Sequence, residues 1–165
     1  MAQPGLRPFL PADAPTLAAL FRASVEELAA DDYSEDQREA WVSAADDEAE
    51  FGARLAGALT IVALVDGEIA GFASLKDNTL FDMLYVRPDL ARQGVGTALA
   101  DAIEKLAGAR KTQKLTVEAA DSARDFFAAR GYIGQSRNTV TMNGEWLGNT
   151  TMVKELAAPA AGSTH

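Results

Sequence analysis

The chain has 165 residues, of which 48% are hydrophobic and 24% are charged, so it is long enough for one domain with a sizeable core. It has no cysteine and its single histidine is the last residue, His165, which argues against disulfides, thiolate catalysis and a histidine triad or metal cage inside the fold; no metal is expected. The formal net charge of −9 argues against nucleic-acid binding, and the absence of a signal-peptide pattern and of any apolar run near the roughly 18–20 residues of a membrane helix predicts a cytoplasmic protein that binds no membrane.

The first third of the chain is predicted to be mostly helical. The segment GLRPFLPADAP (5–15) predicts a short strand that ends at a proline-containing turn. Asp13 is the expected N-cap of a helix over residues 14–30, where apolar residues recur at helical spacing. The stretch SEDQ (34–37) matches a capping box and predicts a second helix, and residues 46–57 predict a third, short one.

The hydrophobic period then changes to that of strands. Residues 59–65 and 68–75 flank Asp66-Gly67, a strong hairpin signal, and residues 79–86 predict a third strand in succession. These three segments predict an antiparallel core for the sheet.

The last third of the chain alternates between helices and strands. A helix is predicted whose first turn is RQGVGT (92–97) and whose apolar stripe starts at Val95, then a strand over 114–120, and then a short helix that ends before Gly131. Two further strands flank Asn143-Gly144, a second hairpin signal. We therefore predict an α+β fold, with a mixed, mostly antiparallel sheet of about six or seven strands and about four flanking helices. It forms a single domain over residues 1–156, and residues 157–165 are expected to be a disordered tail.

Gly94 and Gly96 stand where a strand has ended and a helix begins, although each glycine in a helical turn costs about 1 kcal/mol relative to alanine. The first turn of a helix has backbone N–H groups without partners and a partial positive charge. Glycine lets an anion approach these amides, Arg92 adds a positive charge and Thr97 a hydroxyl, which indicates a pyrophosphate site. On the glycine spacing alone, a tight turn with close helix–sheet packing explains the pattern equally well.

Three stretches together resemble the GNAT superfamily of N-acetyltransferases. The run LYVRPDLARQGVGTAL (84–99) is similar to the family's acetyl-CoA motif, and DSARDFFAARGY (121–132) to its second motif. The hairpin VDGEIAGFASL (65–75) fits the strands before the first motif. The resemblance covers about residues 5–156, and LAADDYSEDQREAW (28–41) is similar to a bacterial subgroup of small acetyltransferases.

The resemblance implies acetyl transfer from acetyl-CoA to an amine of a small molecule or peptide, by direct attack on the thioester. It implies a pantetheine arm beside Leu84, Tyr85 and Val86, with an amide near Leu84 polarising the thioester carbonyl. The pyrophosphate-binding amides would be those of Gln93, Gly94, Val95, Gly96 and Thr97. Three positions depart from the family: Ala91 replaces Arg or Gln, Ala120 replaces Asn, and Phe127 replaces a Tyr proposed as general acid. Phe127 is then an apolar wall along the pantetheine arm, and the acid role does not carry over.

An attacking amine must lose its proton, so a base is needed, and no histidine is available for it. Asp82, in the apolar run LFDMLYV, is the first candidate, and a solvent-facing charge is the alternative explanation for it. Glu118 is the second candidate, unless it caps or pairs with Arg124, and Tyr85 offers the nearest hydroxyl as an acid.

Tyr33 and Trp41 fall in the region that walls the acceptor pocket in the family, although Trp41 also fits a core aromatic. A non-catalytic acyl-CoA sensor, or a small domain whose glycine turn only packs, would be the other functions. The chain is expected to be a monomer or homodimer.

Overall fold

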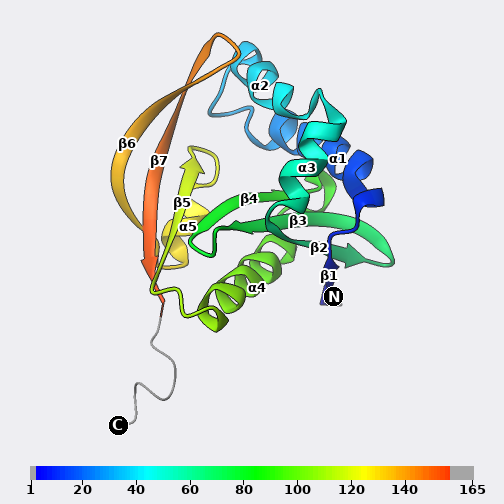
Figure 1. Ribbon diagram of the computed structural model, residues 1–165. Helices are drawn as coiled ribbons and strands as arrows, with labels where there is room; N and C mark the ends of the chain where they lie inside the picture. The colour runs from blue at the N-terminus through cyan, green and yellow to red at the C-terminus, as the bar shows by residue number, and fades with distance from the viewer. Residues whose placement is uncertain (1–2, 157–165) are drawn as a thin grey trace.

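The computed structural model describes residues 3–156 and forms a seven-stranded sheet with helices on both faces (Figure 1). The segment expected to be a disordered tail, 157–165, lies outside the described residues. The strands are β1 (Gly5–Pro8), β2 (Leu59–Val65), β3 (Glu68–Lys76), β4 (Leu80–Val86), β5 (Lys114–Ala120), β6 (Ile133–Met142) and β7 (Glu145–Glu155). The helices are α1 (Ala14–Leu28), α2 (Glu35–Val42), α3 (Glu48–Ala56), α4 (Val95–Ala109) and α5 (Arg124–Ala129), with short 3-10 turns at Pro11–Asp13, Ser43–Ala45 and Pro88–Leu90.

The strand order is β1-β2-β3-β4-β5-β7-β6, and every neighbouring pair is antiparallel except β4–β5. The predicted mixed, mostly antiparallel α+β fold is confirmed. The described residues contain five α-helices, against about four expected, and the short helix predicted over 46–57 is one of them.

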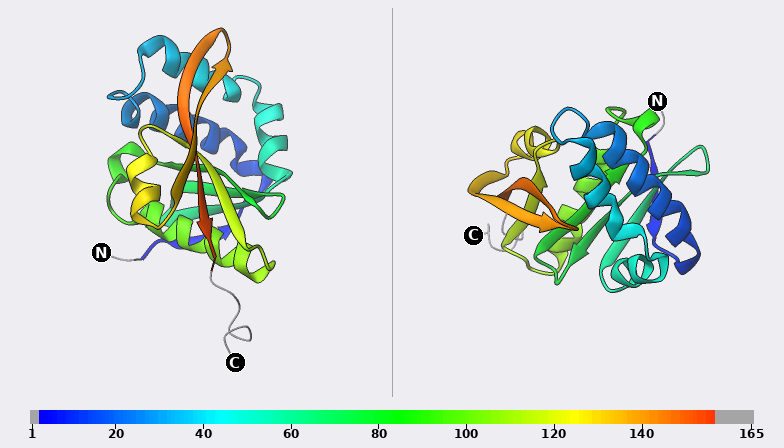
Figure 2. Two further views of the ribbon diagram at one scale, coloured as in Figure 1. Left: turned by 90° about the vertical axis from the view of Figure 1, so that its left-hand side faces the viewer. Right: turned by 90° about the horizontal axis from the view of Figure 1, so that it is seen from above.

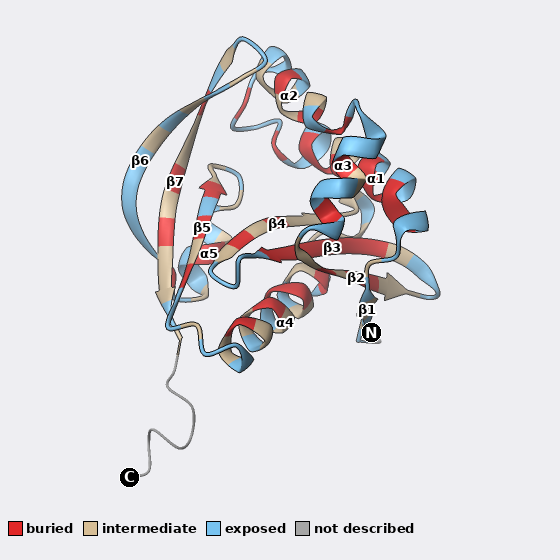
Figure 3. Cartoon of the chain, viewed as in Figure 1, coloured by how far each residue is buried: buried red, intermediate tan, exposed pale blue. Residues whose placement is uncertain are grey.

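Helices cover the two faces of the sheet unequally. One face packs against α1, α2 and α3 through a core that includes Leu17, Phe51 and Phe72, and the other packs against α4 and α5. Figure 2 shows this layering from two directions. Residues 70–75 of β3 are buried without interruption, as Figure 3 shows, because both faces of this central strand are covered.

Helix α4 lies very close to the sheet. A side chain at Gly71 of β3 would place its Cβ 2.9 Å from the carbonyl oxygen of Tyr85 and 3.1 Å from Val95 and Leu99 of the helix. Only glycine fits there without displacing backbone or helix. This contact fixes the start of α4 beneath the end of β4, where the site lies.

The two helix caps expected from the sequence differ in how far the structure contains them. Ser34 and Gln37 form the predicted capping box, with bonds of 3.1 and 2.8 Å between each side chain and the other residue's amide. Asp13 occupies the predicted N-cap position of α1, but its side chain makes no capping hydrogen bond to that helix. Its carboxylate instead accepts hydrogen bonds from Arg7 and from the amide of Leu10, which caps the 3-10 turn Pro11–Asp13. The hydrogen bond from Arg7 lowers the pKa of Asp13, so this pair ties β1 to the turn before α1.

Candidate active site

Strands β4 and β5 separate soon after they begin. Their parallel ladder contains only the pairs Leu80–Thr116 and Phe81–Val117. At the next residue β4 has a bulge: Phe81 pairs with Leu75 and Met83 with Ser74, which leaves Asp82 as an extra residue. A bulge bends its strand and often lies beside an active site, and here pairing with β5 stops at the bulge.

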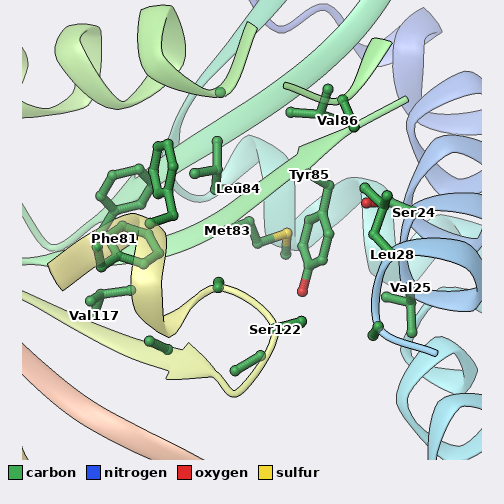
Figure 4. Close-up of a pocket in the computed structure, with 18 of the residues that line it drawn as sticks. Ser24, Val25, Leu28, Phe81, Met83, Leu84, Tyr85, Val86, Val117 and Ser122 are labelled. Carbon is green, nitrogen blue, oxygen red and sulfur yellow. The ribbon is translucent and has the colours of Figure 1, made fainter. Parts of the chain in front are cut away.

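A cavity of about 460 Å³ occupies the gap between the two strands. Its walls are residues 81–86 of β4 and 117–120 of β5, with α5 beside them. The start of α4, the end of α1 and Trp41 of α2 complete the lining; the residues from the start of α4 are Ala91, Arg92, Gly94, Gly96 and Thr97. Figure 4 shows side chains from β4, β5 and α1 around the opening. A cavity of this volume and mixed lining is typical of small-molecule sites.

The turn into α4 lines the cavity and has an unusual backbone conformation. Arg92 and Gly94 both have left-handed backbone conformations, with φ of 64° and 90°. Alternating conformations of this kind, followed by a helix start, bring several N–H groups together at one point, which favours an anion. A Cβ at Gly96 would meet its nearest neighbours at 3.8 Å, so packing does not require this glycine, which lines the cavity.

Most of the residues expected to bind the cofactor line this cavity. They are Leu84, Tyr85, Val86, Ala91, Arg92, Gly94, Gly96, Thr97 and Phe127. Two of the expected residues do not line it: Val95 is 2% exposed and packs in the core, and the Gln93 side chain bonds the carbonyl of Asp89 at 3.3 Å. Any role of these two residues in anion binding therefore falls to their backbone amides.

Both candidate bases line the cavity, in different surroundings. Asp82 has a 14% exposed side chain, and both of its oxygens accept from Arg54 of α3 at 3.3–3.4 Å. The solvent-facing alternative for Asp82 is therefore wrong.

Glu118 has neutral partners. Its Oε2 accepts hydrogen bonds from Thr151 at 2.7 Å and from Asn138 at 3.3 Å. The alternative pairing with Arg124 is not formed within residues 3–156. Oε1 of Glu118 has no hydrogen-bond partner among the described residues and remains available as an acceptor.

Tyr85 presents the phenol of the site. Its ring packs edge-on against Phe21 at 4.8 Å and beside Phe72 at 5.7 Å between centroids. In Figure 4 its hydroxyl points into the opening on the side of Ser122. Burial raises the pKa of Tyr85 to about 12, so the hydroxyl keeps its proton at neutral pH and can donate it to a hydrogen bond.

The two N-terminal aromatics differ in position. Trp41 lines the cavity and contacts Tyr85, with ring centroids 6.4 Å apart. Tyr33 does not line it: its side chain is buried behind Trp41, and its hydroxyl bonds the backbone of Asp121 and Gly148. Sequence reasoning missed Ser24, Met83 and Ser122 as lining residues, since only the folded chain brings them together.

Comparison with known proteins agrees with this geometry. The family model for the GNAT acetyltransferase domain matches residues 29–156. The chain belongs to the GNAT acetyltransferase family. This N-acetyltransferase is 32% identical to the uncharacterized N-acetyltransferase YafP of Escherichia coli (strain K12), over 89% of its own length and 93% of that protein.

Solved structures show the same GNAT fold. A GCN5-related N-acetyltransferase from Rhodopseudomonas palustris is 61% identical, with a TM-score of 0.93 over 94% of this chain and 98% of that one. The PaiA N-acetyltransferase from Thermoplasma acidophilum, solved in complex with coenzyme A, has a TM-score of 0.77 at 19% identity, over 93% of this chain and 99% of that one. No helix within residues 3–156 is both long and apolar enough to span a membrane.

One departure of this GNAT domain from the family pattern, Phe127, is part of an aromatic cluster in the structure. Phe127 is 3% exposed and stacks edge-on with Phe81 and Tyr132, at 5.3 and 5.1 Å between centroids. It lines the cavity as part of this aromatic cluster and has no proton to donate. Of the three tyrosines in the chain, only Tyr85 lines the cavity.

Proposed function

We propose that this N-acetyltransferase moves an acetyl group from acetyl-CoA to a primary amine of a small molecule or peptide in the cavity between β4 and β5. The observation that carries the proposal is the early end of the β4–β5 ladder. It leaves a cavity between the two strands that is lined both by the start of α4 and by the two candidate bases.

The residues of the cavity fit acetyl-CoA in charge and shape. Arg92 and the amides at the start of α4 would hold the pyrophosphate, and Gly96 leaves space above them. Beyond Phe81 the edge of β4 that faces β5 has no strand partner within the described residues, although the other edge stays paired with β3. The peptide groups on the free edge are available to an extended arm. When bound, acetyl-CoA supplies an acetyl group activated as a thioester. An N–H near Leu84 would stabilise the negative charge that develops on the carbonyl oxygen.

We assign the general base to Glu118, with Asp82 as the alternative. Arg54 donates hydrogen bonds to both oxygens of Asp82, so a proton from the acceptor could reach this carboxylate only if the ion pair opened. Glu118 has only neutral donors, on one oxygen, so its other oxygen can accept a proton from the ammonium of the acceptor. Thr151 and Asn138 orient the carboxylate for this transfer.

We assign the donor to Tyr85. Its hydroxyl remains protonated at neutral pH and points into the opening, so it can stabilise or protonate the departing sulfur. Phe127 would contribute an apolar wall beside the pantetheine arm.

A binding domain without catalysis is the other function considered. It would need no base at the cavity, and the presence of Asp82 and Glu118 in the lining favours the enzyme. Release of free thiol from acetyl-CoA, measured against a panel of amines with product masses, tests the proposal. Amine-dependent thiol release with an acetylated product supports it. Tight acetyl-CoA binding without turnover on any amine would favour the binding domain.

A further inference from the structure

We propose that the acceptor is a small primary amine with an apolar, preferably aromatic, body and without a carboxylate group. This inference rests on the proposed function and concerns the half of the cavity formed by α1, α2 and β4, here called the acceptor end: Val25, Leu28, Ala29, Trp41 and Met83.

The acceptor end is apolar. Val25, Ala29 and Met83 are 2–4% exposed, and Leu28 and Trp41 are the more accessible members of the wall. The indole of Trp41 stands beside the ring of Tyr85, and flat apolar groups pack well against such faces. Ser24, Ser122 and Tyr85 contribute hydroxyls near this wall, which can form hydrogen bonds with the amine of an acceptor.

The cavity lining carries one cation and two carboxylates. Arg92, on the turn into α4, is the only cationic residue of the lining within the described part of the chain, and the proposed function assigns it to the pyrophosphate of acetyl-CoA. Asp82 and Glu118 are the anionic residues of the lining. The nearby Arg54 already contacts both oxygens of Asp82. An ammonium group is therefore attracted to the cavity, whereas a carboxylate on the acceptor would lack a partner and meet like charges.

The surface beside the acceptor end strengthens this preference. The segment from residue 26 to residue 39 carries seven exposed carboxylates: Glu26, Glu27, Asp31, Asp32, Glu35, Asp36 and Glu39. None of the seven forms a salt bridge within residues 3–156, and the one cation of the segment, Arg38, donates to the carbonyl of Tyr33. Unpaired charge of one sign attracts cationic molecules and repels anions.

Binding can be tested apart from turnover through the fluorescence of Trp41. The chain has two tryptophans, and the other, Trp146, is 71% exposed on β7 and outside the cavity lining, so Trp146→Phe leaves Trp41 as the only reporter. This variant, saturated with coenzyme A, is titrated with 2-phenylethylamine, phenylalanine and spermidine. We expect 2-phenylethylamine to bind at least tenfold more tightly than either other amine. Equal or tighter binding of phenylalanine or spermidine, or no response to 2-phenylethylamine, would overturn the inference.

A variant that introduces a positive charge tests the wall itself. Leu28→Arg adds a cation to the acceptor end at a position that is 42% exposed. Leu6→Arg, at 43% exposure on β1 and outside the cavity lining, is the matched control. We expect Leu28→Arg to reduce the preference for 2-phenylethylamine over phenylalanine at least fivefold and Leu6→Arg to leave it unchanged. An unchanged preference in a folded Leu28→Arg protein would contradict the inference.

Turnover separates failure of this inference from failure of the proposed function. Thiol release with phenylalanine or spermidine faster than with 2-phenylethylamine overturns the acceptor class and leaves the acetyltransferase intact. If 2-phenylethylamine binds beside coenzyme A as expected but no amine of a broad panel is acetylated, the acceptor end is supported and the proposed function is overturned.

Discussion

The hydroxyl oxygen of Tyr33 lies 2.8 Å from the amide nitrogen of Asp121 and accepts its hydrogen bond. The same hydroxyl donates to the carbonyl oxygen of Gly148 at 2.6 Å. One phenol thus connects the segment between α1 and α2 with the end of β5 and with β7. Its position behind Trp41 makes it a support of the acceptor end rather than part of its surface.

We expect Tyr33→Phe to destabilise the protein by about 1–3 kcal/mol, since the half-buried amide of Asp121 and the half-buried carbonyl of Gly148 each lose their hydrogen-bond partner. Urea unfolding of the two proteins measures the difference. Affinity for acetyl-CoA should remain within twofold. A variant of unchanged stability but with a strongly raised KM for the amine would instead make Tyr33 a direct substrate contact.

Gly96→Glu is expected to weaken acetyl-CoA binding at least tenfold, because its carboxylate would compete with the pyrophosphate for the amides of α4. The new Cβ has ordinary contacts at 3.8 Å, so the fold should survive. Calorimetric titration measures the affinity. Gly108→Glu makes the same change on the same helix, with no neighbour within 4 Å and away from the cavity, and should bind acetyl-CoA normally. Equal affinities for the two variants would remove the pyrophosphate site from this turn.

Paired amide substitutions distinguish the two candidate bases. We expect Glu118→Gln to lower kcat near neutral pH about 100-fold, the lower range of general-base contributions, and Asp82→Asn less than tenfold. Affinity for acetyl-CoA, measured separately, should change little in either. The reverse order of effects would assign the base to Asp82, with Arg54 releasing it during turnover.

Tyr85→Phe should slow turnover most at low pH. The departing thiolate of a cysteine-like thiol has a pKa near 8.5 and most needs a proton donor below that value. We expect at least a tenfold loss near pH 6 that narrows as the pH rises, read from kcat across the pH range. A loss that does not vary with pH would mean that the thiolate leaves unaided and that Tyr85 acts only through packing.

The tyrosines should also resist ionisation in the folded protein. Burial raises the pKa of Tyr33, Tyr85 and Tyr132 above 10.0, and that of Tyr85 to about 12. A phenol that holds its proton more tightly when folded contributes stability that is fully present below pH 10 and is lost as the pH rises from 10 through 12. Tyrosinate absorbance should therefore appear at higher pH in the native protein than in denaturant. Stability should fall less steeply over this range in Tyr85→Phe. Coincident titration curves would contradict the burial of these hydroxyls.

The local elements of this fold could be read from the sequence. Residues 59–65 and 114–120 were predicted as strands with the bounds they have, because β-rich runs between turn residues leave little choice of end. The Ser34–Gln37 box was equally readable, since both partners lie within four residues. For Asp13 the sequence predicted the N-cap position but not the contacts of the side chain, because Arg7 and the amide of Leu10, on the preceding segment, donate to its carboxylate.

The site was predictable only in part. The turn at 91–97 is a local motif, so its amides and most of its lining residues followed from the sequence pattern. The bulge at Asp82, the ion pair from Arg54 and the bonds from Thr151 and Asn138 to Glu118 depend on pairing between distant segments. The choice between the two bases rests on those contacts, and no local pattern contains them.

The brief contact between β4 and β5 divides the sheet mechanically. Antiparallel ladders connect the strands within each half of the sheet, β1-β2-β3-β4 and β5-β7-β6. Only two residue pairs cross the seam between β4 and β5. Beyond those pairs, side chains connect the two halves, through the Phe81–Phe127 ring contact and the hydrogen bonds of Tyr33. The two halves of the sheet can therefore move relative to each other without breaking the ladders within either half. We expect amide exchange at residues 82–86 and 118–120 to slow together when a molecule bridges the two halves.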